Sequence, residues 1–419
     1  MVKSMNLSAQ IKKQLPLELT GFLQTAGNIS NRLGCKTFLV GGAVRDLLLG
    51  RINLDLDLVV EGDSLKIAEE LARIKNGKVI AHSRFNTAKI KWGKWTVDIA
   101  SARSEGYAEP GALPSVQPSD LKSDLIRRDF SINAMAVSLD PLSFGELIDL
   151  YQGCQDLEKG LIRILHDESF KDDATRLWRA VRYEQRLGFK IDPHTLFLIK
   201  DNLAYLDTIS GDRIRHELEL CLEEERPEKI LRRASDLGLL ARICSSLVAD
   251  DWLVKIFVKA RGKMQPYSPP QELYLSFLML RLTLKELEKT IAYLKFSRPT
   301  AQVLLDSIKL KNELKMLEEP DIPPSWIYKY LSPYSLNAIL SNLISSDSQL
   351  IRQRMELYLT KLRHIQPALS GEDLINSGVP AGHRIKEILG ALLESRLDGR
   401  VSSMAEELEM VDKMGKVKK

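Results

Sequence analysis

Cysteine is scarce in this sequence, with four in 419 residues. They lie at Cys35, Cys154, Cys221 and Cys244, and no two form a Cys-x-x-Cys pair. This spacing excludes a zinc site or a disulfide framework made of cysteines. Unpaired cysteines are typical of proteins that work in the reducing cytoplasm, so we expect a cytoplasmic protein.

Long apolar runs are absent as well. The most apolar stretch, Leu273–Leu284, is shorter than the roughly 20 residues that a membrane-spanning helix needs. The opening residues, MVKSMNLSAQIKKQLPLEL, lack the apolar core of a secretory signal peptide. The sequence also contains no Walker A motif of the form G-x-x-x-x-G-K-S/T. We therefore expect no membrane partner and no phosphate-binding loop of the Walker type.

Neither sign of charge is in large excess, because 60 Lys and Arg face 56 Asp and Glu, a net charge of +4. This balance permits a nucleic-acid or phosphate partner without requiring one, so any such partner has to be argued from local sites. The chain is longer than one ordinary hydrophobic core needs, which predicts several domains.

The spacing of apolar residues divides the chain into a mixed part and a helical part. From Asp172 onward they recur with the helical period of about 3.6 residues, whereas the earlier part mixes short strands and helices. Its predicted elements are a strand over Thr37–Gly42, a helix over Ala43–Gly50, a strand over Leu54–Val60, a hairpin over Thr87–Ser101 and a long loop between Asp98 and Leu125. We therefore predict an α/β unit followed by helices.

Two aspartates, Asp55 and Asp57, lie in the apolar segment LDLDLVV. In a strand, residues i and i+2 point to the same side, so the two carboxylates project together while Leu54, Leu56 and Leu58 face the core. Neighbouring carboxylates raise each other's pKa, and a bound divalent cation relieves the repulsion. The pair predicts a Mg²⁺ site; solvated aspartates on an exposed sheet face are the alternative.

A third carboxylate, Asp98, lies in the strand-like segment WTVDIAS. Three carboxylates can hold two metal ions. A two-metal site activates an attacking hydroxyl and stabilises a leaving pyrophosphate in an in-line phosphoryl transfer. The three aspartates therefore point to catalysis of such a transfer.

A glycine pair, Gly41 and Gly42, follows a predicted strand and precedes a predicted helix. Such a turn lets the backbone approach a phosphate closely and directs helix N–H groups at it. Arg45, in the first helical turn, could pair with the same phosphates. A tight turn without a ligand is the alternative.

The segment RRDFSINAMAV supplies a second group of polar side chains. Arg128 could bind phosphate, and Asp129 or Asn133 could hydrogen-bond a ribose hydroxyl. A cluster of surface salt bridges is the alternative.

The helical segment FKDDATRLWRAVRYEQRLGF carries Asp173, Arg176, Arg179 and Arg182 at every third position, which places them along one oblique ridge. Asp173 offers acceptors and Arg176 offers donors. Cytosine and adenine present an amine donor beside a ring-nitrogen acceptor, whereas uracil and guanine present a carbonyl beside an N–H. This pair could accept C or A and reject U and G. A salt bridge on a solvated helix face is the alternative.

In this order, the segments LVGGAVRDLLLG, LDLDLVV, DIASAR, RRDFSINAMA and DDATRLWRAVRYEQRLGF resemble the class II tRNA nucleotidyltransferases, the CCA-adding enzymes and bacterial poly(A) polymerases of the DNA polymerase beta superfamily. The resemblance covers Phe38–Phe189 most strongly. It implies an α+β fold, with a polymerase-beta-like nucleotidyltransferase head that has a mixed β-sheet, followed by an all-α neck, body and tail. The implied boundaries are 1–160, 161–230, 231–350 and 351–419.

The resemblance also implies roles for matching residues. Asp55 and Asp57 would hold Mg²⁺, and Asp98 would help to activate the RNA 3′-hydroxyl. Gly42 and Arg45 would bind the phosphates of the nucleotide, and Arg128 would make a further contact with it. Asp173 and Arg176 would read the base. Arg179 and Arg182 would support that pocket. The family usually has Glu-Asp-Pro where this chain has Asp172-Asp173-Ala174.

The implied activity is addition of C, C and A from CTP and ATP to the 3′ end of tRNA, without a nucleic-acid template. Within the same class, the protein could add only CC, only the terminal A, or a poly(A) tail. An RNA-binding protein with a dead site is the alternative of another class. The sequence does not separate CCA, CC and A addition.

Overall fold

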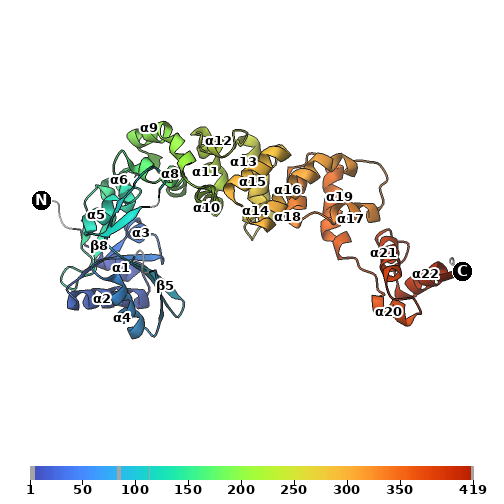
Figure 1. Cartoon of the computed structure of the whole chain (residues 1–419), viewed down its shortest axis with the longest axis horizontal. Coiled ribbons are helices and arrows are strands. Elements are labelled where there is room, and N and C mark those ends of the chain that lie inside the picture. The colour runs from blue at the N-terminus through green and yellow to red at the C-terminus, as the bar shows by residue number, and fades with distance from the viewer. Residues whose placement is uncertain (1–4, 83–85, 113, 417–419) are drawn as a thin grey trace. The chain divides into compact units, whose positions relative to one another are not determined.

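The computed structural model describes residues 5–82, 86–112 and 114–416. The chain divides into two compact units, residues 1–242 and 243–419. The first contains the β-sheet, whereas the described elements after Ile243 are all helices (Figure 1). This order confirms the predicted α+β head followed by helical segments. The finer boundaries expected at residues 160, 230 and 350 stay predictions.

A mixed seven-stranded sheet forms the head, in the order β3-β4-β5-β2-β1-β8-β9. Neighbouring strands are antiparallel except β2 and β5, which run parallel. The strands are β1 (Lys36–Val40), β2 (Leu56–Glu61), β3 (Lys78–His82), β4 (Thr87–Trp92), β5 (Trp95–Ser101), β8 (Met135–Ser138) and β9 (Leu147–Asp149). The strands and the hairpin predicted from alternation are therefore confirmed.

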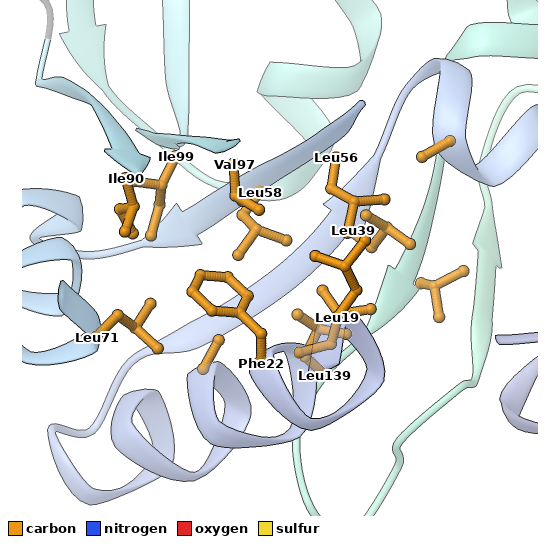
Figure 2. Packing of buried hydrophobic residues seen from close by; sticks show 14 of the residues in the cluster. Leu19, Phe22, Leu39, Leu56, Leu58, Leu71, Ile90, Val97, Ile99 and Leu139 are labelled. Carbon is orange, nitrogen blue, oxygen red and sulfur yellow. The ribbon is translucent and has the colours of Figure 1, made fainter. Parts of the chain in front are cut away.

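One face of the sheet forms the core of the head. Leu56 and Leu58 of β2 are buried, and Figure 2 shows them on the side that faces Phe22 of α2 (Leu17–Arg32). Because side chains alternate along a strand, Asp57 lies on the opposite face. Leu54, predicted to share the core, is instead 41% exposed because β2 begins only at Leu56.

Helices cover the core face and continue beyond the sheet. The four that contribute apolar residues to the core are α1 (Ser8–Gln14), α2 (Leu17–Arg32), α3 (Gly42–Leu48) and α4 (Ser64–Ile74). The others of the first unit are α5 (Leu121–Ile126), α6 (Gly153–Lys159), α7 (Ser169–Asp172), α8 (Thr175–Leu187), α9 (Pro193–Asp201), α10 (Gly211–Leu222) and α11 (Pro227–Asp236). Helix α12 (Leu239–Ile243) lies at the division between the units.

Packing between α2 and the end of β8 leaves no room for a side chain at Gly27, where a Cβ atom would overlap the carbonyl oxygen of Leu139. We expect Gly27→Ala to destabilise the first unit by about 2 kcal/mol, because the helix or the strand end has to move. Gly21→Ala is the matched control, because Gly21 lies on the same helix and a Cβ atom there would meet no atom of another described element within 4 Å. Urea unfolding followed by hydrogen exchange of peptides from α2 measures both; equal stabilities would contradict the prediction.

The predicted long loop between Asp98 and Leu125 is only partly a loop. It contains a two-stranded antiparallel ribbon, β6 (Arg103–Gly106) with β7 (Ser115–Pro118). Pro118 does not prevent this pairing because it lies at the end of its strand. Leu113, within the same segment, lies outside the described residues.

The helix predicted to carry Asp173, Arg176, Arg179 and Arg182 is interrupted at its start. Helix α7 ends at Asp172, Asp173 adopts an extended conformation (φ −145°, ψ 100°), and α8 begins at Thr175. The carboxylate of Asp173 accepts hydrogen bonds from the N–H and the hydroxyl of Thr175. The three arginines therefore lie on α8 as predicted, whereas Asp173 precedes it.

The second unit is built from helices, and its buried apolar residues include two separate clusters. Its helices are α13 (Asp251–Met264), α14 (Gln271–Met279), α15 (Leu284–Leu294), α16 (Arg298–Glu313), α17 (Pro324–Leu331), α18 (Leu336–Ser345), α19 (Gln349–Thr360), α20 (Gly371–Asn376), α21 (His383–Leu397) and α22 (Met404–Lys416). None of the helices in the described ranges combines the length and apolarity that crossing a bilayer demands.

Candidate active site

Three strands place charged side chains in one row on the face of the sheet that points away from Phe22. Asp57 of β2 is the direct register partner of Asp98 on β5, and Asp98 is the partner of Lys89 on β4. Direct partners in a sheet point to the same side. Asp55, two residues before Asp57, lines the same pocket, which has a volume of about 1020 Å³. The three carboxylates predicted from the sequence are therefore brought together.

The electrostatics of this row favour a bound cation. Burial and the nearby Asp55 and Asp98 carboxylates together raise the pKa of the Asp57 carboxyl to about 6, against the opposing effect of Arg128. Lys89 donates a 2.8 Å hydrogen bond to Asp98 Oδ2, which raises the pKa of Lys89. A divalent cation would relieve the repulsion that these shifts report.

The donor set fits Mg²⁺, which takes hard oxygen ligands and is usually held by one or two carboxylates together with substrate phosphates. Asp55 and Asp57 supply such a pair. Within the described residues, no three His, Cys, Asp or Glu side chains gather closely enough to hold an ion by themselves. The site therefore suits a cation that two carboxylates hold and that keeps its other coordination positions open for substrate phosphates.

Gly41 leaves space beside these carboxylates. It has φ 73°, and a Cβ atom there would lie 3.1 Å from Arg128 Nη1 and 3.6 Å from Asp57 Oδ2. A larger residue would fill the gap between the guanidinium and the carboxylate. Helix α3, which starts at Gly42, has only seven residues, so the close approach at Gly41 matters more than a helix dipole.

Arg128, a predicted phosphate ligand, does not use all of its hydrogen-bond donors within the described part of the chain. Its Nη2 donates to Asp124 Oδ2 at 2.9 Å, whereas its Nε is buried without a partner among the described residues. A buried donor without an acceptor costs free energy that an added phosphate oxygen would recover.

Arg45, also predicted to bind phosphate, already has partners. Its Nε and Nη2 donate to the two oxygens of Asp46 at 2.9 Å, and its Nη1 donates to Asn133 Oδ1 at 2.7 Å. The side chain is 3% exposed, although it still contributes to the pocket wall. This geometry gives Arg45 a clear structural role, and its contact with phosphate stays a prediction.

Asp129 and Asn133, predicted to contact a ribose, belong to the same buried network. Asp129 Oδ2 accepts hydrogen bonds from Nε and Nη2 of Arg179 at 2.9 and 2.6 Å, and its Oδ1 accepts from the Asn133 amide at 3.0 Å. Burial opposes ionisation of Asp129, but Arg179 and Asn133 outweigh it and lower the pKa to about 2. The network fixes α8 against the segment that carries Arg128.

The predicted base readers, Asp173 and Arg176, line the same pocket. Asp173 Oδ1 accepts a 2.8 Å hydrogen bond from Arg213 of α10, a partner that the sequence did not indicate. Arg176 donates to the backbone carbonyls of Ser169 and Arg127. Both side chains are therefore held in fixed orientations, and both contribute to the pocket wall.

Tyr183 of α8 is a further pocket residue that sequence reasoning missed. The guanidinium groups of Arg45, Arg179 and Arg182 lie 5.3, 5.7 and 5.2 Å from the centre of its ring. Arg182, predicted to support the pocket, lies behind this ring and pairs with Glu217 at 3.7 Å. Cation–π contacts of this kind attract the guanidinium groups to the ring and help to hold them beside it.

Lys89 was missed for a different reason. It lies opposite Asp98 in the predicted hairpin, so counting the register outward from the turn at Trp92–Lys94 would have found it. Arg213 lies on a separate helix, and no local pattern points from it to Asp173.

Comparison with known proteins agrees with this geometry. A family model described as the poly A polymerase head domain matches residues 37–163, and one described as a probable RNA- and SrmB-binding site of polymerase A matches residues 188–250. An A-adding tRNA nucleotidyltransferase of Geobacter sulfurreducens is 36% identical over 96% of this chain and 47% of that protein. The chain thus spans about half the length of that relative.

Two further matches extend over whole chains. An A-adding tRNA nucleotidyltransferase of Halalkalibacterium halodurans is 31% identical over 92% of this chain and 90% of that protein. A solved CCA-adding enzyme in its apo form II superposes with a TM-score of 0.84 at 30% identity, over 99% of this chain and 100% of that one. The chain therefore belongs to the tRNA nucleotidyltransferase family, as its motifs predicted.

Proposed function

We propose that this protein is a template-independent tRNA nucleotidyltransferase that builds the CCA end of tRNA from CTP and ATP and releases pyrophosphate. The observation that carries the proposal is that Asp55, Asp57 and Asp98 open into the same pocket as Asp173 and Arg176. The carboxylates suited to phosphoryl transfer and the Asp–Arg pair suited to reading a base therefore line the same pocket, in which one nucleotide could contact both. The four free cysteines support a cytoplasmic location.

In the proposed reaction, the tRNA 3′-hydroxyl oxygen attacks the α-phosphorus, a new P–O bond forms, and the bond to the β-phosphate oxygen breaks. Asp98, beside Asp57 in the sheet, receives the hydroxyl proton. Arg128 binds the triphosphate against Gly41, using the Nε–H that has no partner among the described residues. Held at Asp55 and Asp57, Mg²⁺ would supply a Lewis acid that stabilises the charge developing on the phosphate oxygens.

Base selection is assigned to Asp173 and Arg176. A carboxylate oxygen accepts the exocyclic amine of C or A, and the guanidinium donates to the adjacent ring nitrogen. Arg213 holds Asp173, and backbone carbonyls hold Arg176, so neither side chain can turn to suit U or G. U or G would leave polar groups of the site without hydrogen-bond partners, and this free-energy cost discriminates strongly against the wrong base.

Asp173→Asn should lower the preference for CTP and ATP over UTP and GTP by at least about tenfold, because the amide can donate to a carbonyl that the carboxylate repels. Competition assays with labelled nucleotides measure this ratio. Asp172→Asn is the matched control, since this adjacent carboxylate pairs with His166 and does not contribute to the pocket wall. Unchanged selectivity in Asp173→Asn would refute the assignment.

A second candidate, addition of the terminal A alone, is favoured by the two relatives named A-adding. Transcripts that end before CCA, or in CC, incubated with CTP, ATP or both, separate the two. Extension of the shorter transcript by three nucleotides supports the first proposal, whereas A addition to the CC-ended RNA alone supports the second. If neither transcript is extended, both proposals are overturned, and a non-catalytic RNA-binding protein is the alternative that the result supports.

A further inference from the structure

Lys89 is the one member of the charged row that the proposed reaction does not use. It is the register partner of Asp98, which is in turn the partner of Asp57, so its side chain extends across the same face of the sheet. Its ammonium lies 2.8 Å from Asp98 Oδ2 and is attracted to the Asp55 and Asp57 carboxylates as well. The lysine therefore lies where a metal ion would act.

The contact between Lys89 and Asp98 is accessible and easily broken. The two side chains are 44% and 38% exposed. Ion pairs between side chains this exposed are weak, because water and salt screen them, so a divalent cation can replace the ammonium. The lysine has a flexible stem of four carbons, which allows it to swing towards solvent or a substrate phosphate.

The pair of Lys89 with Asp98 adds positive charge to a row of three carboxylates. Asp55, Asp57 and Asp98 would repel one another without a nearby cation. Arg128 lowers the pKa of Asp57, but one of its donors is taken by Asp124. Lys89 adds a second positive charge at the other end of the row, and it occupies an oxygen that Asp98 would otherwise offer to a metal ion or a hydroxyl.

We propose that Lys89 is the resident counter-ion of this row: it holds Asp98 while no divalent cation is bound, and it gives up Asp98 when a cation binds. The inference rests on the proposed function, because it takes Asp55 and Asp57 as the metal ligands. Lys89 acts through Asp98 and is a positioning residue.

The test uses the full-length, metal-free protein and Mn²⁺, whose free concentration can be followed by electron paramagnetic resonance without nucleotide or RNA. Lys89→Met should bind Mn²⁺ about three- to tenfold more tightly than the wild type, because the competing charge is gone. Lys89→Arg keeps the charge and should stay within about twofold of the wild type. Lys91→Met is the matched control, since Lys91 shares the strand and the side but does not contribute to the pocket wall.

A double-mutant cycle separates this mechanism from a general change in surface charge. In an Asp98→Asn background, adding Lys89→Met should change the Mn²⁺ affinity by no more than about twofold relative to Asp98→Asn alone. The reason is that the oxygen for which Lys89 and the cation compete has lost its charge. A melting curve gives a second readout: Lys89→Met should melt below the wild type in EDTA, and the gap should close in excess Mg²⁺.

Unchanged or weaker Mn²⁺ binding by Lys89→Met would overturn the inference, as would an equal gain in the Asp98→Asn background. These results do not depend on incorporation assays. If the wild type extends tRNA while Lys89→Met shows no gain in affinity, only the role of Lys89 fails. If the wild type extends no RNA, the proposed function fails, and absence of Mn²⁺ binding in both proteins removes the role of Lys89 too.

Discussion

Asp57→Asn is expected to lower nucleotide incorporation at least about 10³-fold while changing tRNA affinity by no more than about twofold. Asparagine keeps the size of the side chain but removes the charge from the centre of the carboxylate row. Asp55→Ala is expected to abolish incorporation in the same way, because it removes the other proposed ligand. Single-turnover incorporation of labelled CTP and ATP, together with filter binding of tRNA, measures both effects.

Asp201→Asn is the control for Asp57→Asn. Asp201 lies exposed at the end of α9, in the same unit as the pocket but outside its wall. Full incorporation by Asp57→Asn or Asp55→Ala would refute the metal assignment. A parallel loss of tRNA binding would instead indicate that the change disturbs the fold.

The carboxylate row could be predicted because its pattern is local. Alternation of polar and apolar residues places Asp57 opposite Leu56 and Leu58 in any strand, and a hairpin over residues 87–101 brings Asp98 next to Lys89 once the turn is located. Only the pairing of β2 with β5 joins segments that are far apart in the sequence, and without it Asp57 and Asp98 would not lie side by side. The sequence contained no direct indication of that pairing.

The roles of the arginines could not be predicted in the same way. A guanidinium can bind a phosphate or a protein acceptor, and its spacing along a helix does not distinguish the two. Arg45 is bonded to the adjacent Asp46 and to Asn133, which is 88 residues away in the chain. That Arg128 has a buried Nε without a partner in the described part of the chain could be learned only from the three-dimensional structure.

Asp173 shows how tertiary structure changes a local prediction. The regular spacing of Asp173 with Arg176, Arg179 and Arg182 predicted one ridge on one helix. The chain instead turns at Asp173, which bonds to Thr175 at the start of α8 and to Arg213 of α10. The aspartate still reaches the pocket, but from the turn before the helix and with its orientation set by a distant arginine.

The second large effect concerns stability. Asp129→Asn should destabilise the first unit by about 3 kcal/mol, because it leaves Arg179 without the carboxylate that accepts two of its hydrogen bonds. Asp236→Asn is the matched control, since Asp236 is exposed and its 3.6 Å pair with Arg232 lies on a solvated helix surface. Its effect should stay below about 0.5 kcal/mol.

The same substitution should change the acid sensitivity of the protein. The folded pKa of Asp129 is lowered from 3.8 to about 2, so its contribution is fully present above pH 3.8 and is lost as the pH falls towards 2. This shift corresponds to about 2 kcal/mol, and Asp129→Asn should remove that part of the pH dependence. Urea unfolding at pH 2.5 and pH 6, followed by hydrogen exchange of peptides from α8, measures both quantities. Equal losses at the two pH values would show that the charge of Asp129 contributes nothing to the folded state.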